Sequence, residues 1–298
     1  MRTHFLLPAV AFVLAVAITG CSSDDKDDKA AATGIQYLGL GDSITYGEDI
    51  FIPDTKEARP NGDAFVGYPD LLGQQVFGGH YANLGCPGAT TDSYLSLDGA
   101  DNGCRAFQED MLNTLHVQYT SAEADKADEL LRMNDVHVVT LSIGGNDLLL
   151  TLSGCTKLTP DDATATLTCA LREVPTTISN GAANLGKILQ RIRDTGFKGE
   201  LVYVNLYSTY LSTDTATLAI KSWNSAMATV VSDAGGEVAD AFTAFANEAD
   251  TAGGDPCAAG LLIPNPTADA TPACDIHPTP KGAQLLADTI KALPGFKP

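Results

Sequence analysis

Gly41-Asp42-Ser43-Ile44 comes directly after a short apolar run, Ile35–Leu40. A run of this kind, closed by a glycine, is typical of a buried strand. Ligands of open α/β sheets gather at the carboxyl ends of the strands. Ser43 is therefore expected at a position where solvent and a substrate can reach its hydroxyl group.

Three more motifs follow along the chain, and together with Ser43 they indicate a functional site. They are Asn83-Leu84-Gly85-Cys86-Pro87-Gly88, Gly144-Gly145-Asn146-Asp147 and Asp275-Ile276-His277-Pro278. The first two come just after apolar runs, and the last precedes a predicted helix. The four segments are expected to converge on one edge of a sheet.

Apolar, β-branched runs alternate with helical stretches along the chain, which is typical of a parallel α/β sheet. The predicted strands are Ile35–Leu40, His80–Leu84, Val136–Ile143, Glu200–Leu206 and Glu237–Ala241. The predicted helices are Tyr68–Val76, Ala122–Met133, Asn180–Arg193, Thr217–Ala234 and Lys281–Ala292.

Four segments escape this alternation and are expected to be irregular or to hold only small helices. They are Phe51–Phe65, Asp98–Tyr119, Leu148–Pro175 and Asp255–Pro272. Apolar side chains in two of them, with Tyr68, suggest an acyl-accepting surface, although local core packing explains them equally well: Phe51, Phe65, Leu149 and Leu150. No linker divides residues 34–298, so a single domain is expected there.

The motifs supply the parts of an acyl-transfer site. A serine hydroxyl needs a base to become nucleophilic. His277 combines a carboxylate two residues before it with a proline directly after it. The oxyanion formed on attack needs preorganised donors, each contributing on the order of 3 kcal/mol. The backbone N–H groups of Ser43 and Gly88 and the side-chain amide of Asn146 suit that role.

These motifs resemble the SGNH, or GDSL, hydrolase family over nearly the whole of residues 34–298. Ser43, Gly88, Asn146 and His277 match its four eponymous positions. The resemblance implies a flavodoxin-like three-layer α/β/α sandwich with a five-stranded parallel sheet. It also implies ester hydrolysis through an acyl-enzyme intermediate, without a metal or other cofactor. A G-x-S-x-G elbow, the mark of the α/β-hydrolase fold, does not surround Ser43.

One position departs from the family pattern. The family usually places its acid three residues before the histidine, where this chain has Cys274. Asp275 can accept a hydrogen bond from His277 and hold the tautomer that a base needs. The backbone carbonyl of Cys274 is the alternative, with Asp275 only capping the turn.

The N-terminus has the pattern of an exported lipoprotein. Residues 1–20 form a secretory signal with a positive start and an apolar run. Ile18-Thr19-Gly20-Cys21 resembles a bacterial lipobox that would leave Cys21 lipidated, and ordinary signal cleavage is the alternative. Residues 21–33 are expected to be an acidic tether. Ser22 resembles outer-membrane sorting, so an outer-membrane or cell-surface location is predicted.

The chain has seven cysteines, of which six remain once Cys21 is lipidated. An even set in an exported chain indicates disulfides, although six cysteines allow 15 pairings. Their spacing favours Cys86–Cys104, Cys155–Cys169 and Cys257–Cys274. A zinc site would need a different spacing, since the chain has no C-x-x-C pair.

The sequence thus predicts a membrane-tethered, extracytoplasmic serine esterase or lipase acting on a small-molecule or lipid ester. A net charge of −19 argues against a nucleic-acid partner, because phosphate binding needs clustered Lys and Arg. The alternatives are a carbohydrate deacetylase or lysophospholipase with the same machinery, and a surface-binding lipoprotein that has lost activity.

Overall fold

The computed structural model describes residues 34–53, 60–209, 214–267 and 273–298. The chain divides into two units, Met1–Ala32 and Thr33–Pro298. The predicted signal peptide, Cys21 and the tether lie outside the described residues. Within those residues, none of the helices is both long and apolar enough to span a membrane.

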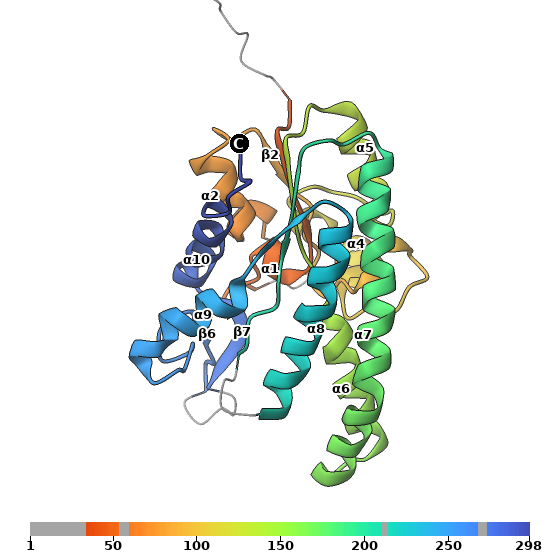
Figure 1. Ribbon diagram of the computed structural model, residues 1–298, viewed down its shortest axis with the longest axis vertical. Helices are drawn as coiled ribbons and strands as arrows, with labels where there is room; N and C mark the ends of the chain where they lie inside the picture. Colours follow the sequence, from red (N-terminus) through yellow and green to blue (C-terminus); the bar gives the residue numbers. More distant parts are fainter. Residues whose placement is uncertain (1–33, 54–59, 210–213, 268–272) are drawn as a thin grey trace, which may run out of the picture. The chain divides into compact units, whose positions relative to one another are not determined.

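A parallel sheet of five strands forms the centre of the second unit, in the order β2-β1-β3-β4-β5 (Figure 1). The strands are β1 (Tyr37–Gly41), β2 (Tyr81–Asn83), β3 (Val138–Ser142), β4 (Glu200–Val204) and β5 (Glu237–Ala239). Tyr37 of β1 is level with Tyr81 of β2 on one side and with Val138 of β3 on the other. All five were predicted, with ends that differ by a few residues.

Helices cover both faces of the sheet. They are α1 (Ser43–Tyr46), α2 (Tyr68–Gln75), α3 (Thr91–Leu95), α4 (Cys104–Asp110), α5 (Glu123–Met133), α6 (Gly145–Leu158), α7 (Ala163–Asp194), α8 (Asp214–Asp233), α9 (Ala241–Ala249) and α10 (Pro280–Lys291). Three short 3₁₀ helices cover Gly62–Ala64, Leu112–Thr114 and Asp250–Ala252. The arrangement confirms the predicted three-layer α/β/α fold.

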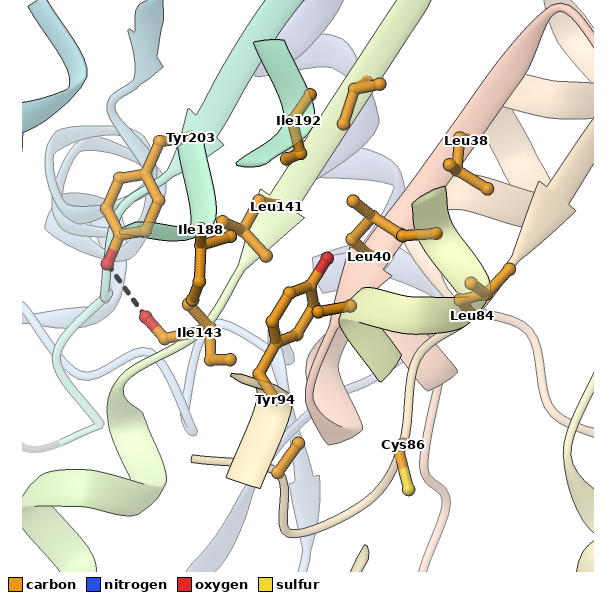
Figure 2. Close-up of a cluster of buried hydrophobic side chains, with 14 of the residues drawn as sticks. Leu38, Leu40, Leu84, Cys86, Tyr94, Leu141, Ile143, Ile188, Ile192 and Tyr203 are labelled. Carbon is orange, nitrogen blue, oxygen red and sulfur yellow. Dashed lines mark hydrogen bonds between the residues drawn. The ribbon is translucent and has the colours of Figure 1, made fainter. Parts of the chain in front are cut away.

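The alternation of side chains along each strand builds two separate cores. Leu38 and Leu40 of β1 pack with side chains of α5, α7 and α8 on one face. Tyr37, on the other face, packs with side chains of α2 and α10. Figure 2 shows part of the first core, where the Tyr203 hydroxyl donates a hydrogen bond to the Ile143 carbonyl at 2.9 Å.

The expectation that Leu148–Pro175 is irregular was wrong. This segment forms most of α6 and the first part of α7, which continues through Pro175. An interior proline costs roughly 3 kcal/mol, and threonines are poor helix formers. Contacts of α7 with α6 and α8 outweigh these local preferences.

A second, two-stranded sheet was also missed. β6 (Leu262–Pro264) pairs antiparallel with β7 (Cys274–Pro278). The first of these strands lies in the Pro- and Asp-rich segment that was expected to be irregular, and it is too short to show an alternating pattern. The second strand contains the Asp-Ile-His-Pro motif, so the histidine lies on a strand.

Candidate active site

The turn after β1 brings Ser43 to the carboxyl edge of the sheet. Gly41 has a φ of +125°, and a Cβ there would lie 1.9 Å from the Ser142 carbonyl oxygen. Only glycine fits such a position. The Asp42 N–H then donates to that carbonyl at 3.0 Å, and the Asp42 carboxylate caps α1 by accepting from the Ile44 N–H. Ser43 is the first residue of this helix.

Ser43 and His277 meet although 234 positions separate them in the sequence. The distance between Ser43 Oγ and His277 Nε2 is 2.9 Å. Asp275 Oδ1 forms a short hydrogen bond with His277 Nδ1 and also accepts from the His277 N–H. The sequence analysis left open whether Asp275 or the Cys274 carbonyl contacts the His277 ring. In the structure the contact at Nδ1 is made by Asp275. The Tyr207 hydroxyl donates to the Ile276 carbonyl at 2.7 Å and anchors this strand.

Gly88 and Asn146 are linked through a residue that the sequence analysis did not select. The backbone N–H of Asn102 donates to the Gly88 carbonyl at 3.0 Å. Its side-chain Nδ2 donates to Asn146 Oδ1 at 2.8 Å. This contact leaves Asn146 Nδ2 as the free donor group of the side chain, and one of its two hydrogens bonds to the Ala89 carbonyl at 3.0 Å. Its second hydrogen is available for a further acceptor.

The backbone at Gly88 leaves little room for any other residue. Its φ is +82°, and a Cβ would lie 2.4 Å from the Asn102 carbonyl oxygen. The Cys86–Cys104 disulfide closes the loop that contains Gly88 and Asn102. The hydroxyl group of Thr91, a little further along, donates to the Asp147 carboxylate at 2.6 Å. This loop is thus tied to the start of α6 at three residues, Ala89, Thr91 and Asn102.

Glu48 is a second carboxylate beside the histidine, and the sequence analysis did not select it. Its Oε2 lies 3.3 Å from His277 Nε2, the same nitrogen that contacts Ser43. Burial alone would lower the pKa of His277, but the hydrogen bonds that its ring donates to Asp275 and Glu48 outweigh this effect and raise that pKa to about 10. Burial also opposes ionisation of Asp275, yet its hydrogen bond to His277 lowers the pKa of this carboxyl.

Two further carboxyl groups are buried behind the serine. Burial raises the pKa of Asp42 to about 7 and that of Glu123 well above its usual range. Glu123 Oε1 accepts a hydrogen bond from the Gly41 N–H at 2.7 Å. Glu123 therefore holds the turn that carries Ser43. Its position in the first turn of α5 is common for an acidic residue, so sequence reasoning had no signal of this contact.

A cavity of about 1310 Å³ opens beside this site, with Ser43 and Asn146 in its wall. Of the side chains suggested as an acyl-accepting surface, Leu149 lines it and the neighbouring Leu150 does not. Phe65 and Tyr68 instead belong to the cores, and Phe51 is exposed elsewhere. A second cavity, of about 930 Å³, lies at the opposite edge of the sheet beside His137 and Phe197.

The three disulfides of the structure join the cysteines that were paired by their spacing. They are Cys86–Cys104, Cys155–Cys169 and Cys257–Cys274. The second connects α6 to α7, and the third fixes β7 one residue before Asp275. The described part of the chain holds no group of three or more His, Cys, Asp or Glu side chains placed to bind a metal ion.

The site places a serine, a histidine and an aspartate in contact at the carboxyl edge of a parallel α/β sheet, and comparison with known families assigns the chain to a class of proteins. The model of the GDSL-like lipase/acylhydrolase family matches residues 40–285. The chain belongs to this family. A comparison with curated protein sequences finds no match.

Solved structures share the fold at low sequence identity. Phospholipase A1 from Streptomyces albidoflavus NA297 is 20% identical with a TM-score of 0.53, over 87% of this chain and 100% of that one. The acetylxylan esterase Axe2 from Geobacillus stearothermophilus is 16% identical with a TM-score of 0.52, over 90% and 97% of the two chains. Enzyme LAE5 from the Lake Arreo metagenome is 19% identical with a TM-score of 0.52, over 88% and 95%.

Proposed function

We propose that the protein is a serine ester hydrolase that works through an acyl-enzyme intermediate. The observation that carries this proposal is the contact of 2.9 Å between Ser43 Oγ and His277 Nε2, with Asp275 on the other ring nitrogen. Membership of the GDSL-like lipase/acylhydrolase family supports the same reaction class.

Each step follows from a group in this arrangement. His277 Nε2 takes the proton of Ser43 as Oγ attacks the ester carbonyl carbon. The side-chain amide of Asn146 and the N–H groups of Ser43 and Gly88 bind the resulting oxyanion. The C–O bond to the alcohol then breaks, and the alcohol oxygen takes the proton from His277. Water repeats the sequence on the acyl-enzyme, releasing the carboxylic acid and restoring Ser43.

Labelling with a fluorophosphonate tests the proposal directly. The reagent should phosphonylate Ser43 Oγ with loss of fluoride, because only an activated serine displaces fluoride at a useful rate. Peptide mass spectrometry should place the adduct on Ser43, and His277→Ala should prevent it. An adduct on another serine, or none on folded protein, would overturn the proposal.

We further propose that the protein is exported and held on a membrane through a lipidated Cys21. The signal-like residues 1–20 and the lipobox pattern support this, as do three disulfides, which are typical of oxidising compartments. Mass spectrometry of the N-terminal peptide from a bacterial membrane fraction should find a diacylglyceryl group on Cys21. A mature protein that begins at another residue, without lipid, would exclude the anchor.

A further inference from the structure

Three helices form the walls of the cavity that opens from Ser43 and Asn146. α6 contacts α7, α7 contacts α8, and all three extend past the carboxyl edge of the sheet (Figure 1). The cavity, about 1310 Å³, exceeds the 300–1,000 Å³ that is usual for sites of drug-sized ligands. Its floor at the sheet includes Leu206, Tyr207 and Ile276.

The α6 wall begins at the oxyanion residue itself. Asn146, Leu149, Leu152 and Thr156 all line the cavity, and their spacing of three to four residues places them along one face of the helix. With a rise of 1.5 Å per residue, this row is about 15 Å long. An apolar path therefore leads from Asn146 along the helix axis.

The other two walls are apolar as well. On α7 and α8 the cavity is lined mainly by apolar side chains, among them Val174, Ile178, Ala219 and Ile220. Eleven large apolar side chains are exposed in the described part of the chain, and five of them face this cavity: Leu149, Leu152, Leu167, Leu171 and Leu218. A large exposed apolar patch of this kind marks an interaction site, and one that lines a cavity is typical of a ligand-binding groove.

We infer that this cavity binds the acyl chain of the ester, and that the substrates are long-chain acyl esters. The inference rests on the proposed function. His277 must protonate the departing alcohol, so the alcohol lies on the His277 side of the carbonyl carbon. The acyl chain then points the other way, along the wall that starts at Asn146. The cavity lining includes Ser43 and Asn146 but not His277.

The far end of the cavity sets the chain length. There the lining becomes polar, with Thr156, Thr159, Asp161, Asp162 and Thr166. A saturated chain advances about 1.3 Å per carbon, given a C–C bond of about 1.52 Å. The row of about 15 Å from Asn146 to Thr156, where the lining becomes polar, then accepts about ten to twelve carbons. Longer chains gain nothing more from the protein.

The test is a series of p-nitrophenyl esters from acetate to dodecanoate, each kept below the concentration at which it aggregates. Burying one methylene group favours binding by up to about fourfold. We therefore expect kcat/KM to rise at least about 100-fold from acetate to decanoate and then to level off. The leaving group is constant, so the series reports the acyl chain alone.

Two variants on α6 separate the cavity from the general surface. Leu152 is 43% exposed and lines the cavity, whereas Leu158 is 76% exposed and does not. Gln is close to Leu in volume and helix propensity. Leu152→Gln should lower kcat/KM for decanoate about tenfold and leave that for acetate within about twofold, because acetate does not reach residue 152. Leu158→Gln should change neither.

Three results would overturn the inference. The first two are equal kcat/KM for acetate and decanoate, and equal effects of the two variants. The third is a higher kcat/KM for decyl acetate, which carries the long chain on its alcohol, without a higher kcat/KM for the decanoate. In each case continued turnover of acetate leaves the proposed function standing. A wild-type protein that cleaves none of the esters would instead refute the proposed function.

Discussion

Ser43→Ala should lower kcat/KM for p-nitrophenyl butyrate by about 10⁴-fold or more. The attacking oxygen is lost, and His277 and the oxyanion donors then act only on bound water. The fold should persist, because alanine is a good helix former at the first position of α1. The side-chain hydrogen bond of Ser43 goes to His277.

Ser225→Ala is the matched control, since it makes the same chemical change on the exposed face of α8. It should leave kcat/KM within about twofold of the wild type. Circular dichroism should show both variants folded. A folded Ser43→Ala protein that keeps most of its activity would exclude Ser43 as the nucleophile.

Glu48→Gln should raise kcat/KM at pH 7 by about ten- to a hundredfold. A histidine acts as a base only when neutral, and with a pKa of about 10 only about one molecule in 10³ has a neutral His277 at pH 7. Activity of the wild type therefore increases as pH rises toward 10. Loss of the Glu48 charge favours the neutral imidazole and so lowers the pKa of His277. The increase of kcat/KM with pH therefore occurs at lower pH in the variant.

A pH profile of kcat/KM for wild type and variant measures this shift. Asp275 and Asp42 also act on His277 and remain in both proteins. Asp49→Asn removes one negative charge from the next residue, whose carboxylate accepts from the Phe51 N–H. The Asp49→Asn profile should match that of the wild type. Coincident profiles for all three proteins would show that Glu48 does not control the protonation of His277.

The sequence predicted the sheet and the four motif residues for a common reason. Both depend on short-range pattern, because apolar runs form the strands and each motif lies at a chain position fixed by a neighbouring element. Spacing alone would have been misleading. Asp135 and His137 have the same separation as Asp275 and His277, and their side chains lie 3.5 Å apart. They lie just before β3, at the opposite edge of the sheet from Ser43.

The contacts that sequence reasoning missed depend on tertiary structure. Asn102 reaches Asn146 across 44 positions, and Glu123 reaches Gly41 across 82. Glu48 follows Ser43 closely, but its approach to His277 depends on where β7 lies. The helix α6 and the first half of α7 were missed because threonines and Pro175 disfavour a helix locally, while packing between the helices stabilises it.

The Cys155–Cys169 disulfide joins α6 and α7 near their far ends. These helices provide two of the three walls beside the reactive serine. The covalent bond between them makes the two walls a single rigid unit. Any adjustment of the cavity to a bulkier substrate must then come from α8, which forms the third wall. Substrate selectivity would thus follow from a cavity of fixed width between α6 and α7. A substrate too bulky for this width would not bind, because the two helices cannot move apart.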